Sequence, residues 1–149
     1  MIDTLDLKIL KALEKNSRLS FAEIGRIVSL SPSATRERVQ KLEEKEVISN
    51  YTVEINSRLL GYDIEAFISV KVFHGKLKSF LSIVGTFPEV KRAYRITGGQ
   101  NVQLEIIAKD RLQLQKLIDK IMEYGDTLTQ LILSEVEIDK EKITYTISK

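Results

Sequence analysis

The chain has 149 residues, and its 23 basic and 21 acidic side chains leave a net charge of only +2. It contains no cysteine, which excludes a disulfide framework, a thiolate nucleophile and a zinc–thiolate site. No apolar run approaches the roughly 20 residues of a membrane span, and the N-terminus lacks the pattern of a signal peptide. We therefore expect a cytoplasmic protein of one or two domains, with no membrane association. Any attraction to phosphate must come from a local arrangement of charge.

The first 50 residues carry the pattern of three short amphipathic helices. Asp3 can cap the first helix, whose inner stripe is predicted to be Leu5, Ile9, Leu10 and Leu13. Ser20 and Glu23 form an S-x-x-E capping box at the start of the second. The inner face of that second helix is predicted to consist of Phe21, Ile24, Ile27 and Val28.

The third helix is the stretch around which the sequence is organised. Ser31 can cap its first turn, Pro32 suits the first helical position, and an apolar stripe follows at Thr35, Val39 and Leu42. Only Ser29 and Leu30 separate it from the helix before. Two short helices joined by so tight a turn form a helix-turn-helix, whose second helix can lie in the major groove of DNA.

Opposite the apolar stripe, the third helix carries groups that can read bases and hold phosphates. Arg36 and Lys41 suit guanine or phosphate, and Gln40 suits the edge of adenine. Glu37 can accept from cytosine, although pairing with Lys41 along the helix is the favoured role. Arg38 lies nearer the core stripe and can brace another helix. The predicted DNA-contact set is Ser31, Ser33, Arg36, Glu37, Arg38, Gln40 and Lys41.

After residue 50 the periodicity changes from helical to alternating. Tyr51, Val53 and Ile55 alternate with polar residues, which predicts a strand, and residues 56–61 are typical of a turn or short helical connection. We therefore predict three parts: a DNA-binding domain over residues 1–50, a strand and hinge linker over 51–62, and a second domain over 63–149.

The second domain alternates strands and helices in a recognisable order. Strands are predicted at Ile64–Val72, Val90–Ile96, Val102–Ala108 and Ile132–Ile138, with a final one at Ile143–Ile147. Helices are predicted at Leu77–Val84, ended by Gly85–Pro88, and after Asp110, with Leu114, Leu117, Ile118 and Ile121 inside. Gly98–Asn101 is predicted to form a hairpin turn. Strand-helix-strand-strand-helix-strand is the ferredoxin-like βαββαβ order, so the fold class is α+β.

Two helices cover one face of such a sheet and leave the other uncovered in a single chain. The first strand places Phe67, and Phe73 beyond it, among polar neighbours on that open side. Exposed apolar groups on a sheet usually mark an interface, so we expect homodimers to form through this domain.

Taken together, these residues resemble the Lrp/AsnC, or feast/famine, family of transcription regulators. The resemblance is carried by Leu30–Ser33, Glu37–Glu43 and Val47–Tyr51, followed by the βαββαβ order, and it covers essentially the whole chain. It implies a winged-type helix-turn-helix domain, a second domain that mediates dimers and larger assemblies such as octamers, and an amino-acid effector bound between subunits. The effector site would lie near the loop at Gly98, Gly99, Gln100 and Asn101.

The sequence departs from the family pattern at three places. Ser29 and Glu46 stand where the family often has glycine, in the turn between the two helices and at the end of the third helix. The loop that commonly reads Gly-Asp-Tyr-Asp is here Gly98-Gly99-Gln100-Asn101, so both acidic positions are absent. Carboxylates there would suit an ammonium group. Two successive glycines permit a ligand to approach the backbone, but they also simply make tight turns.

Enzymatic patterns are missing. His74 is the sole histidine and has no neighbouring ligand set for a metal, and Gly98-Gly99 lacks the spacing of a phosphate-binding loop. We therefore predict a sequence-specific DNA-binding regulator that is not an enzyme and needs no cofactor or metal. The main alternative is an architectural DNA-binding protein with low sequence preference and no effector. A ligand sensor acting on a partner protein is a more distant one.

Overall fold

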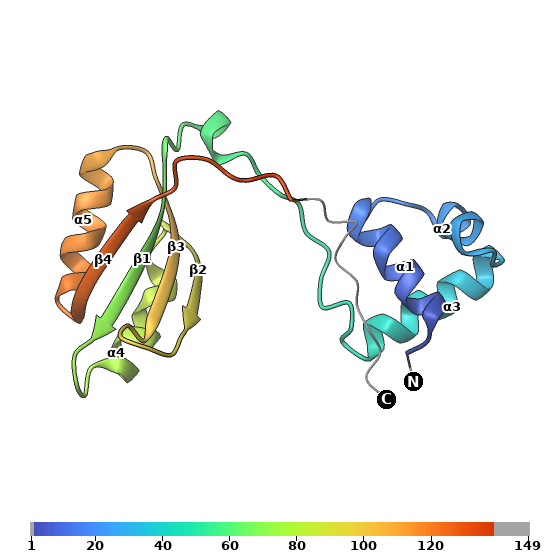
Figure 1. The fold of residues 1–149 in the computed structure, drawn as a ribbon, viewed down its shortest axis with the longest axis horizontal. Helices are drawn as coiled ribbons and strands as arrows, with labels where there is room; N and C mark the ends of the chain where they lie inside the picture. Colours follow the sequence, from blue (N-terminus) through green and yellow to red (C-terminus); the bar gives the residue numbers. More distant parts are fainter. Residues whose placement is uncertain (1, 139–149) are drawn as a thin grey trace. The chain divides into compact units, whose positions relative to one another are not determined.

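A computed structural model describes residues 2–138, which fall into two compact units (Figure 1). The chain passes from the first unit to the second between Glu54 and Ile55, and the second unit ends at Glu137. The first unit is helical and the second is built on a sheet, so each is described by itself. The strand predicted at Ile143–Ile147 lies outside the described residues.

The N-terminal unit contains three helices, α1 (Thr4–Lys15), α2 (Phe21–Val28) and α3 (Pro32–Glu44). The predicted caps are confirmed. Asp3 accepts from two backbone N–H groups of α1, and both Asp3 and Ser20 complete capping boxes. Ser31 caps α3 with Pro32 in the first turn. The helices enclose one apolar core, whose buried members are Ile9, Ile24, Val28, Val39 and Leu42.

The predicted inner face of α2 was partly wrong. Ile24 and Val28 are buried, but Ile27 is 58% exposed and Phe21 is 39% exposed. Gly25 faces inward instead: a Cβ placed there would come within 2.5 Å of the Leu30 carbonyl oxygen. Residues two positions apart in a helix point in directions that differ by about 200°. Since Gly25 faces the core, Ile27 therefore faces solvent.

Two helices of this unit end in the left-handed backbone conformation. Ser29 has φ 58° and Glu46 has φ 56°, and they are the only described non-glycine residues with positive φ. Beyond them, Leu30 N–H donates to the Gly25 carbonyl (2.8 Å) and Val47 N–H donates to that of Leu42 (2.9 Å). These bonds are those of the Schellman motif, which satisfies the last carbonyls of a helix.

The strand predicted over Tyr51–Ile55 does not form. This segment has no strand partner among the described residues, and a 3-10 helix follows at Ser57–Leu60. A strand requires a neighbour to complete its hydrogen-bond ladder, and alternation of side chains alone does not supply one.

The second unit contains, in order, β1 (Ile64–Val72), α4 (Leu77–Ile83), a 3-10 turn (Val84–Thr86), β2 (Val90–Arg95), β3 (Val102–Ala108), α5 (Arg111–Met122) and β4 (Gly125–Leu131). The strands form one antiparallel sheet of order β2-β3-β1-β4, which confirms the ferredoxin-like topology (Figure 1). Its core joins one face of the sheet to α4 and α5, with Ile68, Leu104, Phe80, Leu117 and Ile121 all essentially inaccessible.

The fourth strand begins seven residues earlier than predicted, and Ile132–Ile138 is not a strand. Gly125 pairs with Val72, and a Cβ on Gly125 would meet the Lys71 carbonyl oxygen at 2.5 Å. The inward positions of β4 are taken by Gly125, Thr127 and Thr129, opposite buried residues of β1. The alternation of apolar residues that predicts a strand is therefore absent from β4.

β2 differs from its predicted alternation through a bulge. Val90 pairs with Ile106 and packs on the core, whereas Arg92 pairs with Glu105, so the register shifts between Val90 and Arg92. The extra residue moves Arg92 and Tyr94 to the face opposite Val90.

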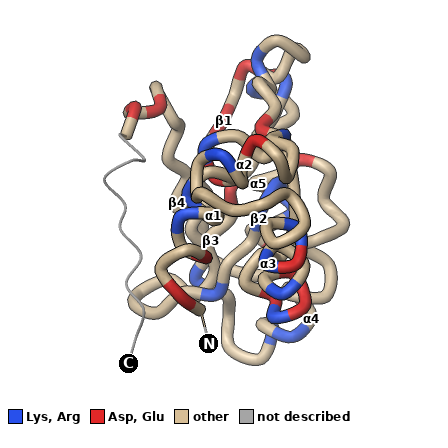
Figure 2. The backbone as a smooth tube through the Cα atoms, turned by 90° about the vertical axis from the view of Figure 1, so that its right-hand side faces the viewer, with Lys and Arg blue, Asp and Glu red and all other residues tan. Residues whose placement is uncertain are grey.

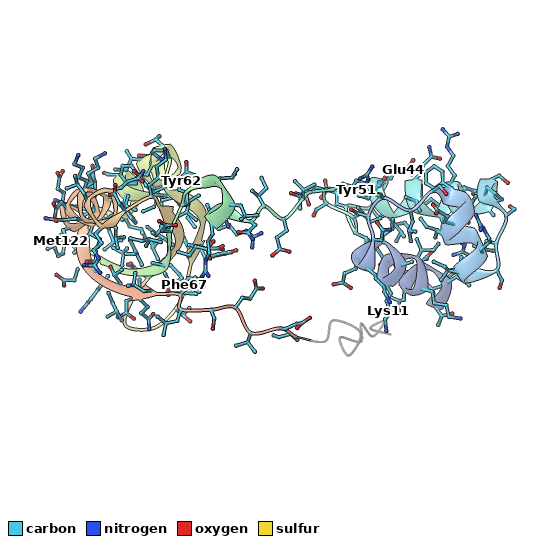
Figure 3. The ribbon with its side chains drawn as sticks, turned by 90° about the horizontal axis from the view of Figure 1, so that it is seen from above. Lys11, Glu44, Tyr51, Tyr62, Phe67 and Met122 are labelled. Atoms are coloured by element: carbon cyan, nitrogen blue, oxygen red, sulfur yellow. The ribbon has the colours of Figure 1, made fainter. Side chains whose placement is uncertain are left out.

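The face of the sheet away from the helices is open in the single chain. Tyr94, Gln103, Ser69 and Leu128 lie in one row across the four strands. Tyr94 and Leu128 are each about half exposed, and Phe67 (labelled in Figure 3) is 39% exposed beside them. The Ser69 hydroxyl donates to Gln103 Oε1 at 2.6 Å in the middle of the row.

Candidate nucleic-acid interface and ligand loop

The outer face of α3 is polar and exposed, while its other side is buried. Thr35, Val39 and Leu42 are the buried stripe. The exposed members of the predicted DNA-contact set are Ser31, Ser33, Arg36, Glu37, Gln40 and Lys41. Basic and acidic residues interleave along the helix, as the blue and red segments of α3 show in Figure 2. The face is therefore a mixed polar surface rather than a purely basic one.

The first turn of α3 uses one of its two serines for the fold. Ser31 Oγ accepts from Ala34 N–H at 3.2 Å, and it also lies 3.1 Å from Ser33 Oγ. The Thr35 hydroxyl donates back to the Ser31 carbonyl at 2.9 Å. Ser31 thus holds the start of the helix, and the hydroxyl of Ser33, two residues further on, lies at the surface.

Glu37 and Lys41 form an ion pair one turn apart, with Nζ 2.7 Å from Oε1. The hydrogen bond and charge of Lys41 lower the pKa of Glu37, and the reciprocal effect raises the pKa of Lys41. Both side chains are more than half exposed, so the pair contributes little to the stability of the unit.

Arg38, which the sequence also placed in the contact set, is engaged within the unit. Its NH1 donates to Asp3 Oδ2 at 2.7 Å and to Asp6 Oδ1 at 2.8 Å. The pKa of Asp3 is lowered by the backbone N–H of Asp6 and by Arg38, whose own pKa is raised in return. The structure therefore joins Arg38 to the N-terminus of α1.

The loop between β2 and β3 holds the predicted effector residues in two different settings. Gly98 and Gly99 are exposed, and Gly98 has φ +116°. Asn101 instead bonds to β1: its N–H donates to the Val70 carbonyl at 3.0 Å, and its Oδ1 accepts from Val72 N–H at 3.0 Å. Asn101 thus fastens one end of the loop and leaves the glycines at its open end.

Residues 2–138 contain neither a membrane-spanning helix nor a metal-binding cluster. No helix in this range is long and apolar enough to cross a membrane. No group of three or more histidine, aspartate or glutamate side chains within the described chain is arranged to hold a metal ion.

Known proteins resemble both units. The family model of the AsnC-type helix-turn-helix domain matches residues 2–43, and that of the Lrp/AsnC ligand binding domain matches residues 65–141. The chain belongs to the Lrp/AsnC family of transcription regulators. The transcriptional regulator LrpC of Bacillus subtilis is 35% identical over 91% of this chain and 94% of its own length. FL11 of Pyrococcus furiosus is 33% identical over 81% of this chain and 80% of its own length.

Solved structures of family members agree with the fold. The structure of B. subtilis LrpC matches with a TM-score of 0.88 and 34% identity, covering 93% of this chain and 99% of the other. A Neisseria meningitidis regulator, NMB0573, solved as a complex with L-Met, matches with a TM-score of 0.87 and 25% identity, covering 94% and 95%. The predicted family and fold class are thereby confirmed, and these Lrp/AsnC relatives are regulators rather than enzymes.

Sequence reasoning missed three structural residues of this Lrp/AsnC chain. Gly25 allows α2 to approach the turn before α3, and the only signal was a glycine inside a helical pattern. Asn101 ties the loop to β1. Tyr51, labelled in Figure 3, donates its phenol hydrogen to Glu43 Oε1 at 2.7 Å, although no local pattern pairs the two.

Proposed function

We propose that this regulator reads duplex DNA with the exposed face of α3. The observation that carries the proposal is the division of that helix: the stripe at Thr35, Val39 and Leu42 is buried, and the groups able to bond bases or phosphates are at the surface. A helix presented in this way by a helix-turn-helix unit fits the major groove.

Within that face, the chemistry of each side chain suggests its contact. Arg36 can bond guanine in bidentate fashion or hold a phosphate, and Gln40 can bond adenine. Lys41 exchanges its partner Glu37 for a phosphate. Ser33, beside the helix start, is placed for a phosphate or base. Ser31 and Arg38 act from within the unit, because their polar atoms are already bonded there.

Two variants test the assignment with matched charge. Arg36→Ala together with Lys41→Ala removes one arginine and one lysine from α3. Arg111→Ala together with Lys116→Ala removes the same pair of charges from exposed positions of α5. We expect operator binding at physiological salt to be lost in the first and kept in the second, with oligomerisation unchanged in both. Unchanged binding in the first variant would contradict the proposal.

We infer that the regulator acts as a homodimer or a larger assembly such as an octamer. The net charge of +2 gives one chain little attraction for phosphate, and pairing two chains doubles the contacts. The open sheet face supports this, since Phe67, Tyr94 and Leu128 are exposed on it. Sedimentation of the full chain at micromolar concentration tests it: Phe67→Glu should shift the assembly toward smaller species. A monomeric unmutated chain would refute it.

We further propose that an amino acid binds between subunits near Gly98 and Gly99 and shifts the assembly. The ligand-binding family model over residues 65–141 and the L-Met complex of NMB0573 support this. A Cβ added at either glycine would meet no atom within 4 Å, so the backbone is open to approach. Calorimetry of the full chain against a panel of amino acids tests the idea. No heat, with no change in assembly, would favour an effector-independent regulator.

The cellular setting follows from the same role. We infer that the protein works in the cytoplasm, bound to DNA, and that it binds ligands without converting them. Selection of genomic fragments by the purified protein, with and without amino acids, tests sequence preference and ligand dependence together. A salt-dependent footprint with no preferred sequence would instead fit an architectural protein.

A further inference from the structure

The two carboxylates at the start of α1 each divide their oxygens between two tasks. Asp3 Oδ1 accepts from the backbone N–H of Leu5 and of Asp6, both at 2.9 Å, and Asp6 Oδ2 accepts from Asp3 N–H at 2.9 Å. The other oxygen of each carboxylate, Asp3 Oδ2 and Asp6 Oδ1, accepts from Arg38 NH1. The two carboxylates that cap α1 therefore also bind the side chain of Arg38 from α3.

This contact lies on the flank of α3, beside the core stripe and beyond the middle of the proposed DNA face. At roughly 100° per residue, Arg38 is about 160° around the helix from both Arg36 and Gln40 and about 60° from Lys41, which lies at the near edge of that face. The side chain of Arg38 is only 30% exposed, and that of Asp6 is 10% exposed. A guanidinium bonded to two carboxylates in this setting is poorly placed to contact a phosphate bound beside Arg36 or Gln40.

We propose that Arg38 is a positioning residue for DNA recognition, which fixes the orientation of α3 by bonding the capping carboxylates of α1. The inference rests on the proposed function, in which α3 is the helix that reads DNA. Asp3 and Asp6 are immobilised by their bonds at the start of α1. A guanidinium from α3 that bonds both carboxylates therefore fixes the orientation of α3 relative to α1. The role is thus mechanical, and Arg38 itself touches no DNA.

Electrostatics and positioning make opposite predictions for Asp3. Asparagine caps a helix as well as aspartate does, so Asp3→Asn keeps α1. It also raises the net charge by one, which by itself strengthens attraction to DNA. If Asp3 holds Arg38, however, loss of its charge loosens α3, and DNA binding weakens. The sign of the change separates the two views.

The experiment measures operator affinity of the full chain as a function of salt for the unmutated protein and four variants: Arg38→Gln, Arg38→Lys, Asp3→Asn and Arg36→Gln. Thermal unfolding of each confirms that it folds. We expect Arg38→Gln to weaken binding roughly tenfold with an unchanged slope of log K against log [salt], because it removes charge-assisted bonds but no phosphate contact. Arg38→Lys should restore part of the loss, and Asp3→Asn should weaken binding several-fold.

Arg36→Gln is the matched control on the DNA face, and it should reduce the salt slope by about 0.9 if Arg36 holds a phosphate. The positioning role is wrong if Arg38→Gln reduces the salt slope in the same way as Arg36→Gln, or if it leaves the affinity for the operator unchanged. It is also wrong if Asp3→Asn tightens binding. If Arg36→Gln changes neither slope nor affinity, the DNA face proposed for α3 fails instead. Should Arg38→Gln not fold, Asp3→Asn still decides the question by its sign.

Discussion

The phenol of Tyr51 donates a 2.7 Å hydrogen bond to Glu43 Oε1, so the extended segment after the third helix is fastened to that helix near its end. Glu43 lies one residue before the end of α3, and Tyr51 lies four residues before Ile55, where the second unit begins. The bond therefore holds the segment that follows α3 against the end of that helix.

This contact predicts an unusual titration. Burial, the hydrogen bond to Glu43 and the charge of Glu43 raise the pKa of Tyr51 from 10.0 to about 12. A pKa raised in the folded state means that the contribution to stability is complete below pH 10 and is lost as the pH rises through about 12. Glu43→Gln removes the charge and should lower that pKa. Ultraviolet titration of phenolate checks it, with Tyr51→Phe identifying which of the tyrosines is followed.

Gly25→Ala should destabilise the N-terminal unit by about 1–3 kcal/mol, because the backbone of α2 must move to admit the methyl group. Its Cβ would lie 2.5 Å from the Leu30 carbonyl oxygen and 3.0 Å from Thr35 Oγ1. Gly85→Ala is the control, since its Cβ meets no atom within 4 Å; it should be neutral or slightly stabilising. Denaturant unfolding compares the two. Equal stability would show that α2 retreats from α3 without cost.

Glu46→Gly should stabilise the protein by roughly 0.5–1 kcal/mol. Glu46 has φ 56°, a conformation that costs a residue with a Cβ about 1–2 kcal/mol, and the greater freedom of glycine in the unfolded chain offsets part of the gain. Glu44→Gly, two residues earlier in regular helix, should be destabilising instead. Thermal unfolding of the pair checks the sign, and stabilisation by both would contradict the argument.

The sequence was most informative where a local rule determines structure. The caps at Asp3, Ser20 and Ser31 depend on side chains within three residues, so they could be read directly. β3 could be predicted because Val102, Leu104 and Ile106 alternate and all are buried. The order of the elements then gave the topology of the second unit.

The predictions from sequence were wrong where the local structure depends on residues that are distant in the sequence. β4 was misplaced because its inward side holds Gly125 and two threonines, which fit against β1 but carry no apolar signal. Tyr51–Ile55 alternates like a strand, yet no described strand pairs with it. The face of α3 was predictable from periodicity, whereas the bond from Arg38 to Asp3 joins residues 35 positions apart. No local pattern reports such a pair.

Asn101→Ala should destabilise the second unit by about 1–2 kcal/mol, because it leaves the part-buried N–H of Val72 without its acceptor. Asn101→Asp keeps an oxygen at that position and should retain most of the stability. Gln100→Ala, beside it in the loop, should change stability little, since the structure gives Gln100 no comparable bond to β1 among the described residues. Unfolding of the three variants tests the structural role. Calorimetry with amino acids then asks whether the loop still binds. If Asn101→Ala is as stable as the unmutated chain, Asn101 does not fasten the loop, and its side chain becomes a candidate for direct contact with an effector.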